Sequence, residues 1–276
     1  MKIITLVENS AISDKFQVEH GLSLYMETDK HKILFDVGRS DLFVDNARKL
    51  NVPLDEVDIL IISHGHHDHG GGLPAFWKIN DKARVYAHKL AFEPHFAMGA
   101  DNKTRFVGLD PGWALKERIT WVDGYLRIDE QLELFGDVSA RKFHSTANDI
   151  LFMQHDGGPL QRDTFRHEQN LIITGENGAR VLVAGCAHNG IVNIVTRFME
   201  IKGAVPEVAL AGFHLMIPDS GQTQPAALLD SIAHWLLSRP VRYYTGHCTG
   251  KQAFDHLKAI MRDKLDYLAT GRQLEF

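Results

Sequence analysis

Residues 63–72 read Ser-His-Gly-His-His-Asp-His-Gly-Gly-Gly, and they decide both the expected fold and the expected site. The apolar, isoleucine-rich run 57–62 before them is typical of a strand covered on both faces. His64 and His66 lie two residues apart and therefore project from the same side of an extended chain. Asp68 and His69 follow in the turn, and the glycines let the backbone bend sharply. Imidazole and carboxylate groups converging in this way predict a metal site, which zinc, iron or manganese would suit.

A polar loop that is merely rich in histidine is the alternative interpretation of this stretch. Four ligand-type residues within six positions, placed directly after an apolar strand, favour the metal site instead.

The chain has 276 residues, enough for one large α/β domain or two small ones. The apolar fraction of 44% is ordinary for a globular core. With 30 basic and 35 acidic residues the net charge is −5, which argues against a nucleic-acid surface. No run approaches the roughly 18 apolar residues of a membrane span, so no membrane partner is expected.

Only two cysteines occur, Cys186 and Cys248, each beside a histidine. Such sparse use fits a reducing compartment better than a disulfide-bonded, secreted protein. The first residues read as a strand and not as a signal peptide, because a glutamate interrupts a short apolar run. We therefore expect a cytoplasmic protein, and the oligomeric state is left open.

Strand and helix signals alternate in both halves of the chain. The expected strands are 3–7, 21–27, 32–36, 57–62, 84–88, 170–174, 180–184, 208–213 and 241–245. The expected helices are 41–50, 72–78, 191–202, 226–237 and 252–263, and 265–276 forms a final piece. Residues 90–163 between them are less regular, with strand-like pieces at 119–122 and 150–153. Strands followed by helices in both halves fit two sheets packed between outer helices.

Several further motifs occur in a fixed order along the chain. They are Glu8-Asn9, Glu-His-Gly-Leu-Ser at 19–23, Leu-Phe-Asp-Val-Gly at 34–38, Gly-Cys-Ala-His at 185–188, Gly-Phe-His-Leu at 212–215 and Gly-His-Cys-Thr-Gly at 246–250. Together with residues 63–72 this set resembles the dihydropteroate-synthase-like branch of the metallo-β-lactamase superfamily. The resemblance implies an α/β fold, an αββα sandwich of two mixed sheets between outer helices. It also implies one domain over residues 1–276, in which an insertion at about 90–163 shapes the substrate pocket.

The same resemblance implies two divalent metal ions, with zinc preferred and manganese or iron as alternatives. His64 and His66 match the ligands of one ion. Asp68, His69 and His247 match those of the other. Asp36 matches an aspartate that supports the ligand loop without touching metal, a role that fixes imidazole orientation. A simple turn aspartate before glycine is the alternative for Asp36.

The chain departs from the common pattern around the hairpin of residues 170–184. Most of the superfamily has a ligand histidine before this hairpin and a metal-bridging aspartate after it. Here His167-Glu168 precedes it and Gly-Cys-Ala-His follows it. Extended geometry would put Cys186 and His188 on the same side. We expect His188 to bind metal and Cys186 to stand beside the ligands, or simply to be buried. His167 or Glu168 could fill the remaining ligand position, so the number of ions stays open.

Four histidine and carboxylate positions are candidates for catalysis or substrate binding. Asp68 could accept a proton as well as bind metal, and His214 is the main candidate for a non-metal catalytic or substrate-binding group. His20 and Glu168 are expected to contact the substrate. For His214 the alternative is a hydrogen-bonded structural histidine. Histidines outside the motifs, His95 among them, are taken as structural.

The chemistry of such a site favours a metal-dependent hydrolase, because metal ions make hydroxide available near neutral pH and polarise the oxygen under attack. The expected substrate is a small anion, a phosphoester or related compound. The alternative is a transferase that joins a dihydropterin diphosphate to an aminobenzene ribofuranosyl phosphate, a reaction found in the resembled branch. A binding or redox module is the third reading, and the missing glycine-rich flavin fingerprint argues against it.

Overall fold

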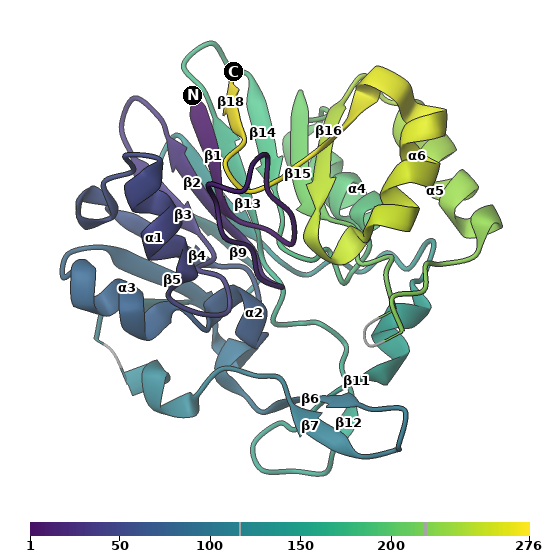
Figure 1. The fold of residues 1–276 in the computed structure, drawn as a ribbon, viewed down its shortest axis with the longest axis horizontal. Helices are drawn as coiled ribbons and strands as arrows, with labels where there is room; N and C mark the ends of the chain where they lie inside the picture. The colour runs from purple at the N-terminus through teal and green to yellow at the C-terminus, as the bar shows by residue number, and fades with distance from the viewer. Residues whose placement is uncertain (116, 218–219) are drawn as a thin grey trace.

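The computed structural model describes residues 1–115, 117–217 and 220–276. Two mixed seven-stranded sheets and one small sheet account for its strands (Figure 1). The first sheet has the order β18 (Gln273–Glu275), β1 (Lys2–Val7), β2 (Ser23–Glu27), β3 (Lys32–Phe35), β4 (Ile59–Ile62), β5 (Arg84–His88) and β8 (Ile119–Val122). The second has the order β17 (Leu265–Tyr267), β16 (Arg242–Gly246), β15 (Val208–Gly212), β14 (Arg180–Val183), β13 (Asn170–Thr174), β10 (Leu132–Phe135) and β9 (Tyr125–Arg127).

The helices cover the outer faces of these two sheets. Those beside the first sheet are α1 (Leu42–Lys49) and α3 (Leu73–Ile79), and those beside the second are α4 (Ile191–Lys202), α5 (Ala226–Leu237) and α6 (Lys251–Met261) (Figure 1). The single turn α2 (His67–Gly70) carries part of the metal motif. No helix in the described part of the chain is long and apolar enough to cross a membrane.

Alternation along the strands explains the four layers. In β4, Ile59 and Ile61 join the core between the two sheets, whereas Leu60 and Ile62 join the core beneath α1 and α3. Across the interface, Val181 of β14 lies in the central core and Leu182 in the core beneath the helices of the second sheet. Side chains of a strand alternate between faces, so each central strand must be apolar on both. The αββα sandwich expected from the sequence is confirmed.

The segment from about 90 to 163 contributes to three sheets. Strands β8, β9 and β10 extend the two main sheets. The remainder forms a four-stranded sheet with the order β12 (Gln161–Arg162), β11 (Leu151–Met153), β6 (His95–Met98) and β7 (Thr104–Phe106). This small sheet stands apart from the sandwich at the bottom of Figure 1, below the end of β4 and α2. It therefore lies where it can cover the metal motif.

Candidate metal centre

The motif loop follows the carboxyl end of β4, and a buried carboxylate holds the loop in shape. Asp36 is fully buried and has φ 60°, a left-handed backbone that aims it at the loop. Its Oδ1 accepts a hydrogen bond from the Ser63 backbone N–H at 2.7 Å, and its Oδ2 accepts from the Ser63 hydroxyl at 2.7 Å and from His69 Nδ1 at 2.6 Å. Asp36 thus ties Ser63 and His69 of the loop together.

Four buried histidines each have Nδ1 engaged by a neighbouring oxygen. His64 Nδ1 lies 2.8 Å from the Ser63 hydroxyl, and His69 Nδ1 is bound to Asp36. His247 Nδ1 lies 2.9 Å from Asn9 Oδ1, and His188 Nδ1 lies 3.0 Å from Asn148 Oδ1. An amide or carboxylate oxygen can only accept a hydrogen bond, and the Ser63 hydroxyl donates its proton to Asp36. Each Nδ1 therefore carries the ring proton. Each Nε2 is left with a lone pair.

These Nε2 atoms face one another in two pairs. His69 Nε2 and His247 Nε2 are 3.2 Å apart, and His64 Nε2 and His188 Nε2 are 3.3 Å apart. Buried lone pairs at this separation need a cation or a proton between them. His66 Nε2 is also buried without a hydrogen-bond partner. The residues therefore fit metal ions, by the orientation of their nitrogens and not only by their type.

These histidines belong to two adjacent sets of donor atoms. The all-nitrogen set is His64, His66 and His188, and the mixed set is Asp68, His69, Cys186 and His247. In the mixed set, Cys186 Sγ lies 3.1 Å from His69 Nε2, and Asp68 Oδ2 lies 3.2 Å from His247 Nε2. Three nitrogens in one set and nitrogen, oxygen and sulfur in the other are donor types that suit zinc.

Cys186 and His188 both face the candidate metal positions, and their ligand-type atoms lie within 4.8 Å of each other and of His214. Strand β14 ends at Val183, and Ala187 between the two residues has φ 53°. The chain turns at this left-handed position, and Cys186 also belongs to the mixed set while His188 also belongs to the all-nitrogen set. The cysteine expected beside the ligands is thus among the candidate donors themselves.

The residues before the hairpin occupy other places. Glu168 is buried and accepts hydrogen bonds from the backbone N–H of His188 at 2.6 Å and of Asn189 at 3.0 Å. Burial raises the pKa of Glu168, and the hydrogen bonds from Asn189 and His188 oppose that rise. It therefore holds the loop that carries His188. His167 belongs to neither donor set, and its nitrogens contact Gly65 and Asp163.

Without metal, the mixed set retains a proton. Burial by itself lowers the pKa of His247, but the hydrogen bond to Asp68 and nearby negative charges raise it to about 9. Burial by itself raises the pKa of Asp68, but His69, His247 and His20 hold it well below its usual range. A metal ion would replace this shared proton, because ligands bind metal in their deprotonated form.

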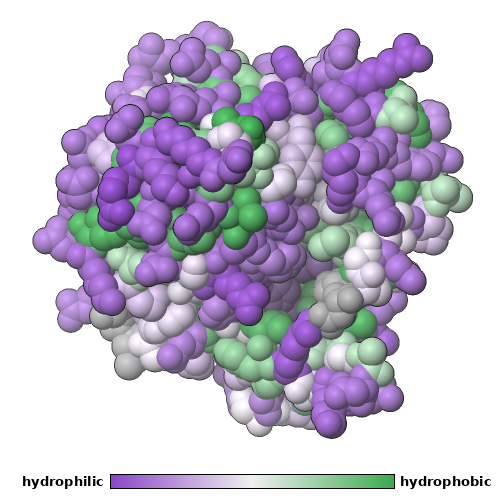
Figure 2. All heavy atoms as spheres, in the orientation of Figure 1, coloured by the Kyte–Doolittle hydropathy of each residue, from purple (hydrophilic) through white to green (hydrophobic). Residues whose placement is uncertain are grey.

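The donor sets open into a cavity of about 490 Å³. Its lining includes His20, Arg39, Asp68, Arg105 and His214. Figure 2 shows a mainly hydrophilic face that is hollowed near its centre, with hydrophobic side chains toward the small sheet. Cationic side chains beside a metal centre suit an anionic ligand.

His20 and His214 lie at this cavity in different ways. His20 Nε2 is 3.4 Å from Asp68, and burial and the nearby His247 lower its pKa to about 4. His214 is 5% exposed, has φ 47°, and neither ring nitrogen has a hydrogen-bond partner. A buried imidazole in a strained backbone and without partners is suited to a ligand that is still to bind.

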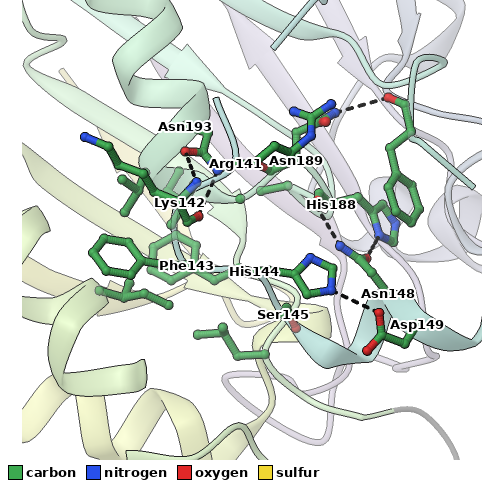
Figure 3. A pocket seen from close by; sticks show the side chains of 18 of the residues that line it. Arg141, Lys142, Phe143, His144, Ser145, Asn148, Asp149, His188, Asn189 and Asn193 are labelled. Carbon is green, nitrogen blue, oxygen red and sulfur yellow. Dashed lines mark hydrogen bonds and ion pairs between the residues drawn. The ribbon is translucent and has the colours of Figure 1, made fainter. Parts of the chain in front are cut away.

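A second cavity of about 270 Å³ lies beside His188 (Figure 3). Asn148 lies next to His188 there, and its Nδ2 also donates to the His188 carbonyl oxygen at 2.8 Å. Asn193, at the start of α4, accepts from the Lys142 backbone N–H at 3.0 Å and donates to the Lys142 carbonyl. These contacts hold the walls around His188 and are internal to the protein.

Sequence reasoning did not single out the amides that orient the ligands. Asn9 stood in a motif without an assigned role, and Asn148 had no motif at all. Asn9 lies 238 positions from His247, and Asn148 lies 40 positions from His188. No local spacing links such partners. A ligand imidazole almost always donates its second N–H to an acceptor, and this is the one signal that points to such residues.

Comparison with known proteins agrees with this geometry. The sequence profile of the Metallo-beta-lactamase superfamily matches residues 17–233. The 7,8-dihydropterin-6-methyl-4-(beta-D-ribofuranosyl)-aminobenzene-5'-phosphate synthase of Methanocaldococcus jannaschii is 29% identical, over 100% of this chain and 97% of its own length. An uncharacterised protein of the same organism is also 29% identical, over 92% of this chain and 93% of its own.

Among solved structures, Tm1679, a metal-dependent hydrolase of the beta-lactamase superfamily, superposes with a TM-score of 0.82 at 28% identity. The match covers 100% of this chain and 99% of Tm1679. The profile match spans well over half of the chain, including the whole motif at 63–72. The fold, the donor sets and these relatives agree, and the chain belongs to the metallo-beta-lactamase superfamily.

Proposed function

We propose that this chain is a metal-dependent transferase for small phosphorylated substrates, joining a dihydropterin to an aminobenzene ribofuranosyl phosphate. The observation that carries the proposal is the pair of adjacent donor sets opening into one cavity whose lining includes Arg39 and Arg105. This arrangement suits a diphosphate, which carries several negative charges close together. The synthase from M. jannaschii, similar over the full chain, supports the choice of substrates.

The proposed step is a displacement at carbon. The bond between the pterin methyl carbon and the diphosphate oxygen breaks, the bond from that carbon to the amine nitrogen forms, and the amine loses a proton. Bound divalent ions would supply charge neutralisation for the departing diphosphate. His64, His66 and His188 would hold one ion, and Asp68, His69, Cys186 and His247 the other.

The chain's own side chains would complete the site. Arg39 and Arg105 line the cavity and attract phosphate groups. His214 lines the cavity with neither ring nitrogen hydrogen-bonded, and it would contact the substrate and take the amine proton. His20 lies against Asp68 at the same cavity and would contact the substrate there. Glu168 would act indirectly, through the backbone of His188.

A hydrolase is the second candidate, in which water takes the place of the amine. Within the described residues, no carboxylate belongs to both donor sets, because Cys186 stands after the hairpin where most of the superfamily has a bridging aspartate. Bound ions would make hydroxide available near neutral pH, which is the chemistry that attack by water requires. The similar hydrolase Tm1679 supports this candidate.

One experiment separates the two. Zinc- or manganese-loaded protein is incubated with a dihydropterin diphosphate, with and without the aminobenzene ribofuranosyl phosphate, and diphosphate and condensation product are measured. Diphosphate release that requires the amine and yields the product supports the transferase. Release at the same rate without the amine supports the hydrolase. With metal binding confirmed, failure to release diphosphate in either mixture would overturn the choice of substrate. His66→Ala is the inactive control.

A further inference from the structure

A third cluster of metal-type side chains lies directly behind the all-nitrogen set. His66, His95, Asp163 and His167 are all buried, and their ligand-type atoms lie within 4.8 Å of one another. Asp163 Oδ2 is 3.1 Å from His95 Nδ1 and 3.0 Å from His167 Nε2. Three nitrogens and one oxygen would suit a tetrahedral zinc site. The proton positions favour a different role.

The tautomer of His167 argues against a third ion. The backbone N–H of Gly65 points at His167 Nδ1, with a separation of 3.0 Å, and a backbone N–H can only donate. His167 Nδ1 must therefore accept, and the ring proton sits on Nε2 and is donated to Asp163. A metal ion at Nε2 would remove the only proton of a ring whose other nitrogen is already accepting. A hydrogen-bonded network explains the contacts of His167 with Gly65 and Asp163, and it leaves the ring proton on Nε2.

His95 supplies the positive charge in this network. Its Nε2 lies 3.2 Å from the carbonyl oxygen of Leu90, and its Nδ1 lies 3.1 Å from Asp163. Both partners accept, so both ring nitrogens donate and the ring is an imidazolium. Burial by itself raises the pKa of Asp163, but His167 and His95 hold it well below its usual range. The result is a buried ion pair next to a neutral His167.

The network joins the ligand loop to the small sheet. Gly65 stands between the candidate ligands His64 and His66, and a side chain at this position would lie 2.5 Å from His95 Nε2 and 2.3 Å from the Ala91 carbonyl oxygen. His95 begins β6, and Asp163 follows β12, so both come from the sheet that lines the cavity through Ala97 and Arg105. One buried carboxylate thereby links the pocket wall to the loop that presents the ligands.

We propose that Asp163, His167 and His95 form a positioning clamp that holds the Gly65 backbone, and with it His64 and His66, in the geometry that binds metal. Asp163 fixes the tautomer of His167, His167 anchors the Gly65 N–H, and His95 balances the charge. None of the three contacts substrate in this role. The role concerns metal binding and does not depend on which substrates the enzyme uses.

The near-isosteric Asp163→Asn tests the clamp. If the carboxamide oxygen stays on the Phe165 N–H that Asp163 Oδ1 accepts at 2.7 Å, its NH₂ group faces His167 Nε2. The ring proton then moves to Nδ1, against the Gly65 N–H. We expect metal affinity at the all-nitrogen set to fall about 10- to 100-fold, the range for loss of a supporting partner. The exposed Asp156→Asn, matched in chemistry, should bind as the wild type does.

The measurement is zinc binding by the metal-free protein, in competition with a chromophoric chelator, together with the absorption spectrum of the cobalt-loaded protein. A second pair of variants keeps the test sound if Asp163→Asn folds poorly. His167→Gln offers an oxygen to Gly65 and an NH₂ to Asp163 and should retain most of the affinity, whereas His167→Leu should lose it. Unchanged affinity and spectrum in Asp163→Asn and His167→Leu would overturn the clamp. So would a third equivalent of zinc that binds the wild type and is lost in Asp163→Asn.

Discussion

Replacing Asp36 with asparagine should weaken metal binding at the mixed donor set without unfolding the protein. The carboxylate accepts three buried hydrogen bonds, two at 2.7 Å from Ser63 and one at 2.6 Å from His69 Nδ1. In the variant, the remaining oxygen will stay on the Ser63 backbone N–H, since that donor cannot reverse. The new NH₂ group then meets the Ser63 hydroxyl, which can rotate to accept, and His69 Nδ1, which carries a proton.

The size of the effect follows from the hydrogen bond that is lost. To avoid the clash, His69 must move its proton to Nε2, the atom that faces His247 and the metal position. A hydrogen bond to a charged partner contributes about 1.5–3 kcal/mol, which corresponds to roughly 10- to 150-fold in affinity. Loss of a supporting partner typically costs a similar 10- to 100-fold. Both routes give the same order of magnitude.

The assay is a two-step zinc titration of the metal-free protein against a chromophoric chelator. The step assigned to the mixed set should weaken by one to two orders of magnitude. The step assigned to His64, His66 and His188 should change less. Asp41→Asn, an exposed aspartate nearby, is the matched control. If Asp36→Asn binds both equivalents as tightly as the wild type, while the cobalt spectrum is unchanged, the tautomer reasoning for this site is wrong.

Three further outcomes are expected. Cys186→Ser should weaken zinc binding at the mixed set and remove the sulfur-to-metal absorption of the cobalt-loaded protein. The control Cys248→Ser should keep that absorption band. A band that survives in Cys186→Ser would exclude the Cys186 thiolate as a ligand. Gly65→Ala should lower the free energy of unfolding by about 1–3 kcal/mol, because the added methyl group meets the Ala91 carbonyl oxygen and His95; an unchanged urea midpoint would contradict it. Burial by itself lowers the pKa of His31, but hydrogen bonds to Asp58 and Asp129, at 2.7 and 2.6 Å, raise it above 6.5. The contribution of protonated His31 to the free energy of unfolding is therefore fully present below pH 6.5, and it is lost as pH rises through the higher folded-state pKa. The stability gap between wild type and His31→Gln should therefore narrow from pH 6 to pH 9, and a constant gap would refute the linkage.

The main elements of the fold could be predicted because their signals are local. The helix expected at 226–237 coincides with α5, and the hairpin at 170–184 with β13 and β14. Strand β10 was missed, because Leu-Glu-Leu-Phe at 132–135 places a glutamate in a buried strand. Glu133 is 6% exposed and is neutralised by Lys202, whose Nζ lies 2.6 Å away. Lys202 is 69 positions from Glu133 along the chain, so no local pattern predicts this ion pair.

In the candidate site, too, local spacing predicts some of the residues, whereas others depend on contacts between distant parts of the chain. Spacing predicts that His64 and His66 lie together, since alternate residues of a strand end share one side, and both belong to the all-nitrogen set. The role of Cys186 could not be predicted in this way, because it depends on contact with His69 Nε2, 3.1 Å away in space but 117 positions away along the chain. His95, taken as structural, lies in the network behind His66. Its contacts to Leu90 and Asp163 are 5 and 68 residues distant, and only the folded chain brings them together.

Both donor sets draw on the two sheets at once, with His64 to His69 from one and Cys186, His188 and His247 from the other. An ion held by His64 and His188 would close a loop of 124 residues. A partly folded chain with only one sheet formed can offer just a fraction of either set, and closing such a loop in a disordered chain is entropically costly. Tight metal binding should therefore come late in folding. Bound metal would then distinguish fully folded molecules from partly folded ones.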